Sequence, residues 1–135
     1  MQELESPKRG RVLVVEDNDS IRLLLRRLLE RGGYDVVAVA LGQAALEAAL
    51  DDINIVLLDA GLPDLNGLEV CRRLRAQPET ADLPIILLTG RTEIEDRRDG
   101  FAAGADDFLT KPFEEAELMA RLHRATLSPF KPASS

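Results

Sequence analysis

The chain has 135 residues, of which 45% are hydrophobic and 30% are charged, so its size and composition fit one globular domain. Its net charge of −7 argues against an intrinsic nucleic-acid footprint, because phosphate contacts require clustered Lys and Arg. The same charge argues against docking on an anionic membrane, and no apolar run approaches the ~20 residues of a membrane span.

The two ends differ in composition from the middle of the chain. Residues 1–10 are polar and lack the apolar stretch of a signal peptide, and residues 128–135 contain two prolines and a serine pair. We expect a flexible N-terminal tail over 1–10, one folded domain over 11–127, and a flexible tail or the start of a linker over 128–135. The single cysteine, Cys71, excludes an internal disulfide and favours a cytoplasmic location.

From residue 11 onward, short apolar runs alternate with helical patterns. The runs predict strands at 12–15, 36–39, 55–58, 85–88 and 108–109. Their hydrophobicity is continuous rather than alternating, which indicates burial on both faces of a parallel sheet. Helical patterns cover about 21–29, 43–50, 67–75, 92–102 and 114–124. Five βα units with right-handed crossovers predict an α/β fold with an open, doubly wound parallel sheet.

The first predicted helix has the clearest apolar stripe. Its spacing places five side chains on one face that we expect to contact the core: Ile21, Leu24, Leu25, Leu28 and Leu29. We expect Asp19 or Ser20 to cap its start and the Gly32-Gly33 pair to end it.

Polar residues follow the strands at their carboxyl ends, where the ligand crevice of such a sheet lies. Only Ala40 follows the second strand, which suits an edge position. The others are followed, in chain order, by Glu16 with Asp17, by Asp59, by Thr89 and by Lys111.

Three carboxylates in one crevice repel each other. Each pair about 4 Å apart costs on the order of 1 kcal/mol in water, and about 4 kcal/mol at an effective dielectric constant of about 20. Lys111 supplies one positive charge against three negative ones. Oxygen ligands without His or Cys favour a hard divalent ion, so we expect Mg²⁺.

Four segments together resemble the receiver family of two-component response regulators. They are VLVVEDN at 12–18, VLLDAGLPDLNG at 56–67, ILLTG at 86–90 and GADDFLTKPF at 104–113. The resemblance covers about residues 11–127. It implies a flavodoxin-like, three-layer sandwich with strand order 2-1-3-4-5. It also implies a phosphoacceptor signalling domain rather than an enzyme, one that promotes its own phosphorylation and slow dephosphorylation.

The resemblance also implies roles for the residues that match the motifs. Asp59 is expected to accept a phosphoryl group from the phosphohistidine of a sensor histidine kinase or phosphotransfer protein. Asp17 is expected to bind Mg²⁺ directly and Glu16 through water, while Asp59 and the carbonyl of Gly61 complete the protein ligands. Glu16 stands where the family usually has Asp.

The remaining matched residues are expected to bind the phosphoryl group and report on it. Lys111 neutralises the phosphoryl oxygens, and Thr89 and the Gly90 amide hydrogen-bond them. Lys111-Pro112 resembles the family's cis peptide. Movement of Thr89 is expected to let Phe108 turn inward, which shifts the population of two surface conformations. The alternative is that Phe108 is an ordinary core residue of the fifth strand.

The surface expected to change is formed by the fourth helix, the fifth strand and the fifth helix. Arg97, Asp107, Glu117 and Arg121 on these elements resemble the salt-bridge set through which receivers of winged-helix transcription factors dimerise. We therefore consider a homodimer formed on phosphorylation, against the alternative of a solvated charged face whose exposed pairs are each worth about 0–1 kcal/mol.

Two other classes of protein share some of these sequence features. Asp17-Asn18-Asp19 resembles the motif of haloacid-dehalogenase-type phosphatases, with Asp17 as nucleophile and Asp19 as general acid. That family needs another strand with metal-binding acids after Lys111, where only one helix remains. A flavodoxin-like FMN protein needs a Ser/Thr/Gly phosphate loop after the first strand, and acids stand there instead.

Several other residues have an ordinary structural interpretation. Cys71 lies on a helix stripe and is expected to be a small core residue. His123 is expected at the surface, and Asp64 and Asp106 are expected to be solvated charges.

Overall fold

The predicted apolar runs pair into one parallel five-stranded sheet in a computed structural model that describes residues 9–90 and 94–127, without the side chains of 94–97 and 127. The strand order is β2-β1-β3-β4-β5, as expected. The strands are β1 (Arg11–Val15), β2 (Asp35–Val39), β3 (Ile55–Asp59), β4 (Ile85–Thr89) and β5 (Asp107–Thr110).

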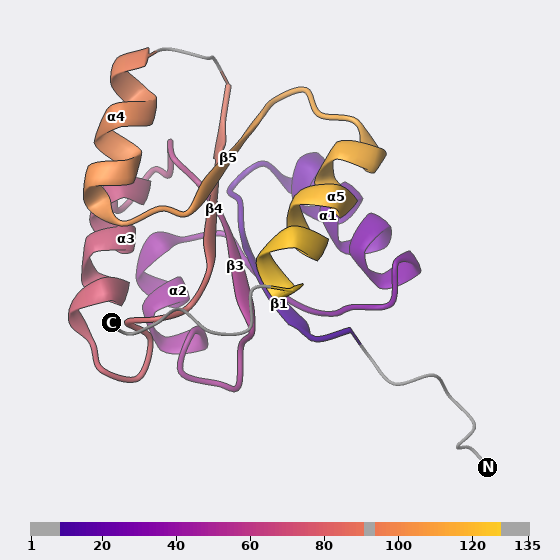
Figure 1. Cartoon of the computed structure of the whole chain (residues 1–135), viewed down its shortest axis with the longest axis horizontal. Coiled ribbons are helices and arrows are strands. Elements are labelled where there is room, and N and C mark those ends of the chain that lie inside the picture. The colour runs from indigo at the N-terminus through magenta and orange to yellow at the C-terminus, as the bar shows by residue number, and fades with distance from the viewer. Residues whose placement is uncertain (1–8, 91–93, 128–135) are drawn as a thin grey trace.

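Helices cover both faces of the sheet (Figure 1). On one side lie α1 (Asp19–Arg31) and α5 (Glu115–Leu127). On the other lie α2 (Gly42–Ala48), α3 (Gly67–Ala76) and α4 (Ile94–Ala103). Of the part of the chain that the structure describes, no helix combines the length and apolar composition needed to cross a membrane.

Alternate residues of each central strand belong to opposite cores. Val12 and Val14 pack under α1 and α5, whereas Leu13 and Val15 pack on the other face. This double burial explains why the apolar runs are continuous. The edge strand β2 is only partly buried, and Ala40 follows it.

Helix α1 differs from the prediction at two points. Its N-cap is Asn18, whose side chain accepts a hydrogen bond of 2.9 Å from the Ile21 amide, rather than Asp19 or Ser20. Leu24 is 47% exposed, while Leu25 and Leu29 are fully buried. Leu24 lies about a quarter turn from the centre of the apolar stripe, which places it at the margin of the core contact. The end of the helix at Gly32 agrees with the prediction.

The other helix bounds shift by a few residues. α2 ends at Ala48 instead of residue 50, and the predicted start of the fourth helix at Thr92 lies outside the described residues. Arg9 already bonds to the fold, because its amide donates to the Gly33 carbonyl at 2.9 Å. Boundaries of the folded domain at residues 11 and 127 stay a prediction.

Candidate functional site

The parallel register brings the predicted site residues to one edge of the sheet. Asp59 and Thr89 are the last residues of β3 and β4, and Glu16 and Lys111 directly follow β1 and β5. Val15 pairs with Leu58, so the chain continues from β1 beside Asp59. The Lys111 amide donates to the Thr89 carbonyl at 2.7 Å, which joins the ends of β4 and β5.

Glu16 is buried although it carries a carboxylate, with 1% of its surface exposed. Its Oε2 accepts a hydrogen bond from the Asn18 amide at 3.0 Å, and its Oε1 lies 2.9 Å from Lys111 Nζ. Both carboxylate oxygens therefore have a partner within the protein.

Asp59 is the second buried carboxylate, at 6% exposure. Its Oδ1 accepts a hydrogen bond of 3.1 Å from the Gly61 amide and lies 3.5 Å from Lys111 Nζ. Burial raises the pKa of the Asp59 carboxyl, and the nearby carboxylates of Glu16 and Asp17 add to this rise. The Gly61 amide and the Lys111 ammonium oppose it without cancelling it.

Lys111 is the cation that lies between the two buried acids. Burial by itself lowers the pKa of Lys111, but Glu16 and Asp59 outweigh that effect and the pKa is raised. The ammonium is therefore charged at neutral pH. The Lys111-Pro112 peptide is cis, as the resemblance implied.

Glu16, Asp17 and Asp59 form the acidic cluster. Each offers a carboxylate oxygen, and these oxygens all lie within 4.8 Å of one another. Asp17 is exposed, so the cluster opens to solvent on its side. With Lys111 as their single close cation among the described residues, the three carboxylates fit a hard divalent ion that takes oxygen ligands.

Two glycines leave open space beside the cluster. Among the described residues, no atom lies within 4 Å of the place where a Cβ would stand on Gly61 or on Gly90. Gly67 is the opposite case, because a Cβ there would collide with the backbone carbonyl of Asp59 and with Ala60.

Phe108 lies in the core on the α4 side, at 5% exposure. Phe101 of α4 packs edge-on against it, with ring centroids 4.8 Å apart and the planes at 71°. Gly100 permits this approach, because a Cβ there would stand 2.5 Å from Phe108 Cζ. The predicted switch partners therefore lie on neighbouring strands: Thr89 is the last residue of β4, and Phe108 lies in β5.

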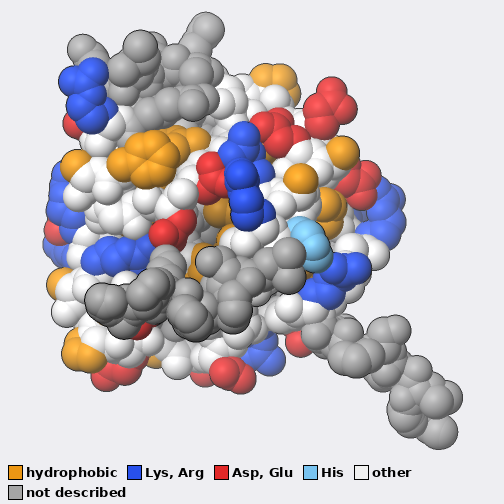
Figure 2. All heavy atoms as spheres, in the orientation of Figure 1, with side chains coloured by type: hydrophobic (Ala, Val, Ile, Leu, Met, Phe, Trp, Pro, Cys, Tyr) orange, Lys and Arg blue, Asp and Glu red, His pale blue; other side chains and the backbone are white. Residues whose placement is uncertain are grey.

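The predicted dimer residues on β5 and α5 already form ion pairs within one chain. Arg121 binds Asp107 at 2.6 Å and Glu117 at 3.3 Å, and Arg124 reaches Asp107 at 3.2 Å. We call these four residues the β5–α5 charge cluster. The side chain of Arg97 lies outside the described residues. Figure 2 shows acidic and basic side chains interspersed on the visible face rather than gathered by sign.

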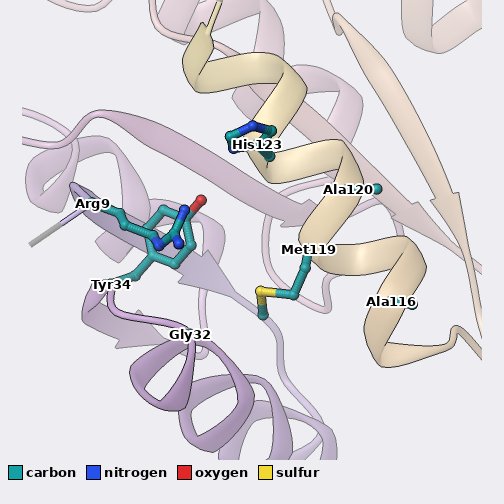
Figure 3. Close-up of a pocket in the computed structure, with 7 residues that line it drawn as sticks. All are labelled: Arg9, Gly32, Tyr34, Ala116, Met119, Ala120 and His123. Carbon is teal, nitrogen blue, oxygen red and sulfur yellow. The ribbon is translucent and has the colours of Figure 1, made fainter.

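A groove of about 470 Å³ lies between the end of α1 and α5 (Figure 3). Its lining is largely apolar, with Arg9 and His123 as the basic members: Arg9, Gly32, Tyr34, Ala116, Met119, Ala120 and His123. It contains no residue of the acidic cluster. His123 is exposed, in agreement with its expected surface position.

Sequence reasoning missed the polar contacts of three residues. Arg22 donates to the carbonyls of Glu16, at 3.0 Å, and Asp17, at 3.4 Å, and so braces the loop that carries both acids. Asp64 and Asp106 are not merely solvated. Asp64 binds two amides of α2, at 2.8 and 3.0 Å. Asp106 binds Arg75 and the Ile85 amide, each at 2.8 Å. Cys71 is buried, as predicted.

The comparisons with known proteins agree with this fold. A family model of the response regulator receiver domain matches residues 12–123. The phosphate regulon transcriptional regulatory protein PhoB of Rhizobium meliloti is 46% identical over 125 residues, which is 90% of this chain and 54% of that protein. Response regulator MprA of Mycolicibacterium vanbaalenii is 47% identical over 113 residues, 83% of this chain and 48% of that protein.

Two solved structures resemble the chain closely. The receiver domain of sensor histidine kinase PA1611 from Pseudomonas aeruginosa, with magnesium in its active-site cleft, has a TM-score of 0.81 and 37% identity over 86% of this chain and 96% of that one. The BeF3-activated N-terminal receiver domain of Klebsiella pneumoniae RstA has a TM-score of 0.80 and 32% identity, covering 86% and 97%.

The chain belongs to the receiver domain family of response regulators. It is a phosphoacceptor domain of two-component signalling. It spans about half the length of the curated relatives it matches. The phosphatase alternative has no support, and Asp19 is exposed and paired with Arg22 at 2.7 Å.

Proposed function

We propose that Asp59 is the phosphoacceptor. An oxygen of its carboxylate attacks the phosphorus of a phosphohistidine on a sensor kinase or phosphotransfer protein. The phosphorus–nitrogen bond breaks, the imidazole leaves and takes up a proton, and an acyl phosphate forms on Asp59. The observation that carries this proposal is the position of Asp59, a buried carboxylate at the end of β3, with Lys111 at 3.5 Å and two further acids beside it.

The same arrangement supports Mg²⁺ as the cofactor. Asp17 and Asp59 would hold the ion directly, together with the carbonyl of Gly61. Glu16 would act through water, since its Oε2 accepts a hydrogen bond from the Asn18 amide and its Oε1 is ion-paired with Lys111. When bound, the metal supplies positive charge that lets the acids and the phosphoryl oxygens approach each other.

The protein groups then orient and neutralise the transferred group. Lys111 provides an ammonium that is already next to Asp59, and Thr89 and the Gly90 amide provide hydrogen-bond donors from the end of β4. Movement of Thr89 toward the phosphoryl group would give Phe108 room to turn, and the packing of Phe101 on Phe108 would carry that change to α4. One phosphoryl group is consumed per chain, so the domain acts as a stoichiometric switch rather than a turnover enzyme.

Intact mass after incubation with acetyl phosphate and Mg²⁺ tests the proposal. We expect one added phosphoryl group in the wild type, and none in Asp59→Asn or when EDTA replaces the metal. A second acid, Asp82→Asn, is the matched control, because it is exposed and lies on the connection between α3 and β4. Phosphorylation that persists in Asp59→Asn would contradict the assignment.

The β5–α5 charge cluster supports a second proposal, a homodimer formed on phosphorylation. In a dimer formed through α4, β5 and α5, ion pairs of Asp107, Glu117 and Arg121 would form between the two copies instead of within one. Arg97 would take part in the same set of ion pairs. Because the pairs exist within one chain, the exchange gains little by itself and the dimer should weaken with salt. Sizing of the beryllofluoride-treated protein tests this, and a monomer at low salt would contradict it.

The cytoplasm is the proposed compartment. The single cysteine of the chain, Cys71, is buried and free, which fits a reducing environment. In this proposal, the phosphoryl donor transfers its group in the cytoplasm, where the longer regulators that this chain resembles also act.

A further inference from the structure

The segment between β3 and α3, residues 60–66, is the phosphoacceptor loop. It carries Gly61, whose amide donates to Asp59 Oδ1 at 3.1 Å and whose carbonyl is a proposed metal ligand. The loop is closed at its base, where the Gly67 amide donates to the Ala60 carbonyl at 3.1 Å. Near Gly61 itself the described residues leave open space, whereas the next residue, Leu62, is buried in the core at 8% exposure.

A side chain further along the loop adds a polar connection to this packing. Asp64 accepts two hydrogen bonds from the first turn of α2: Oδ1 from the Gly42 amide at 2.8 Å and Oδ2 from the Gln43 amide at 3.0 Å. The N-cap residue of α2 is Leu41, which has no polar side chain with which to bind these amides. A residue more distant in the chain thus caps the helix. The two amides also hold the pKa of the Asp64 carboxyl below its ordinary value.

The two segments also meet by close packing. Gly42 is buried, and a Cβ on it would stand 2.9 Å from the Leu65 carbonyl and 2.9 Å from Val70 Cγ2. The start of α2 therefore lies directly against the phosphoacceptor loop, and Asp64 fixes the two with a pair of bonds. With both carboxylate oxygens engaged, the loop has one defined position relative to α2.

We propose that Asp64 is a positioning residue for phosphorylation. By anchoring the phosphoacceptor loop to the amides of Gly42 and Gln43, it keeps the amide and carbonyl of Gly61 in place beside Asp59. This role rests on the proposed function of Asp59 and of the metal ligands. Asp64 touches neither the metal nor the phosphoryl group, and acts on Mg²⁺ binding through the loop.

The test compares Asp64→Ala with Asp64→Asn in the full chain. Both variants remove one charge, but Asn keeps a carbonyl oxygen that can accept one of the two bonds. A Mg²⁺ titration, monitored by the NMR signal of the Gly61 amide, gives the Kd for Mg²⁺. We expect the Kd to rise by about fivefold in Asp64→Ala, which is the factor that a lost helix cap typically represents, and by clearly less in Asp64→Asn. Asp82→Ala, an exposed acid outside the loop, should leave the Kd unchanged.

Amide hydrogen exchange provides the second measurement. Exchange at Gly42 and Gln43 should accelerate in Asp64→Ala, which verifies that the cap is lost in a folded protein. Faster exchange with an unchanged Kd would assign Asp64 to helix stability alone and overturn the positioning role. An equal rise of the Mg²⁺ Kd in Asp64→Ala and Asp64→Asn would show that only the lost charge matters. That result would also overturn the positioning role. A wild type that binds no Mg²⁺ would instead refute the proposed metal site.

Discussion

Lys111 lies closer to Glu16 than to the proposed phosphoacceptor, with its Nζ 2.9 Å from Glu16 Oε1 and 3.5 Å from Asp59 Oδ1. The ammonium thus compensates a carboxylate that is almost fully buried. At the same time it stays within reach of the atom that would carry the phosphoryl group. Glu16, one methylene longer than the Asp usual in the family, makes this contact while its other oxygen holds the Asn18 amide.

Replacing this cation should destabilise the domain and increase its dependence on metal. In Lys111→Met, Glu16 and Asp59 lose their shared ammonium. We expect the free energy of unfolding in EDTA to fall by about 1–3 kcal/mol, less than for a fully buried pair because the Lys111 side chain is partly exposed. Mg²⁺ should then raise the Tm of the variant more than that of the wild type. Urea and thermal unfolding with and without Mg²⁺ measure both effects.

Arg27→Met is the matched control, because it removes one exposed positive charge from α1. Arg27→Met should change neither the free energy of unfolding in EDTA nor the rise in Tm that Mg²⁺ causes. An equal Mg²⁺-induced rise in Tm for Lys111→Met and wild type would show that Lys111 and the metal do not compensate the same charges.

The raised pKa of Asp59 predicts a specific dependence of stability on pH. Because the folded state holds the proton more tightly than the unfolded state, stability decreases as the pH rises from the ordinary Asp value of 3.8 through the raised folded-state pKa. Asn cannot ionise, so Asp59→Asn should have a higher Tm than wild type at neutral pH in EDTA. The difference should vanish below the ordinary pKa. A Tm difference that is constant from acid to neutral pH would contradict this explanation.

The glycine that begins α3 should tolerate no side chain. In Gly67→Ala the new methyl group meets the Asp59 carbonyl, which is sheet backbone and cannot move aside. We expect a loss of about 1–3 kcal/mol in the free energy of unfolding and slower phosphorylation, because the strain acts on the acceptor residue. Gly61→Ala serves as the comparison, since space is open there, and its stability should stay within about 0.5 kcal/mol of wild type. Similar stabilities of the two variants would contradict the prediction.

A second glycine controls the packing of the proposed switch aromatic. A Cβ on Gly100 would stand 2.5 Å from Phe108 Cζ and 2.7 Å from Leu87 Cδ1. Gly100→Ala should therefore destabilise the domain by about 1–3 kcal/mol and displace the Phe108 ring. Aromatic proton shifts of Phe108, together with urea unfolding, report both changes. Gly90→Ala, with open space at its Cβ, should leave the Phe108 shifts unchanged in the metal-free protein.

The parallel sheet and the meeting of Glu16, Asp59 and Lys111 followed from periodicity and chain order, whereas the strand order followed from the family resemblance. A buried parallel strand has a recognisable composition, and the carboxyl ends of all parallel strands lie at the same edge of a doubly wound sheet. Burial of Leu24 could not be decided in this way, since the spacing that marks a stripe does not determine how wide the contact with the sheet is.

The cap that Asp64 gives α2 could not be predicted either. The two segments are more than twenty residues apart, and their hydrogen bonds exist only after the loop and the helix have packed together. Arg75 and Asp106 are a similar case, because their pairing joins the end of α3 to the residue before β5. Local patterns describe elements well, but they do not describe which loops meet.

The open space that the described residues leave at Gly61 and Gly90 bears on how long the proposed acyl phosphate would last. Hydrolysis of an acyl phosphate requires a water molecule in line with the phosphorus, and neither glycine offers a side chain to exclude it. We expect a larger side chain at either position to slow this hydrolysis, and among the described residues no atom would clash with its Cβ.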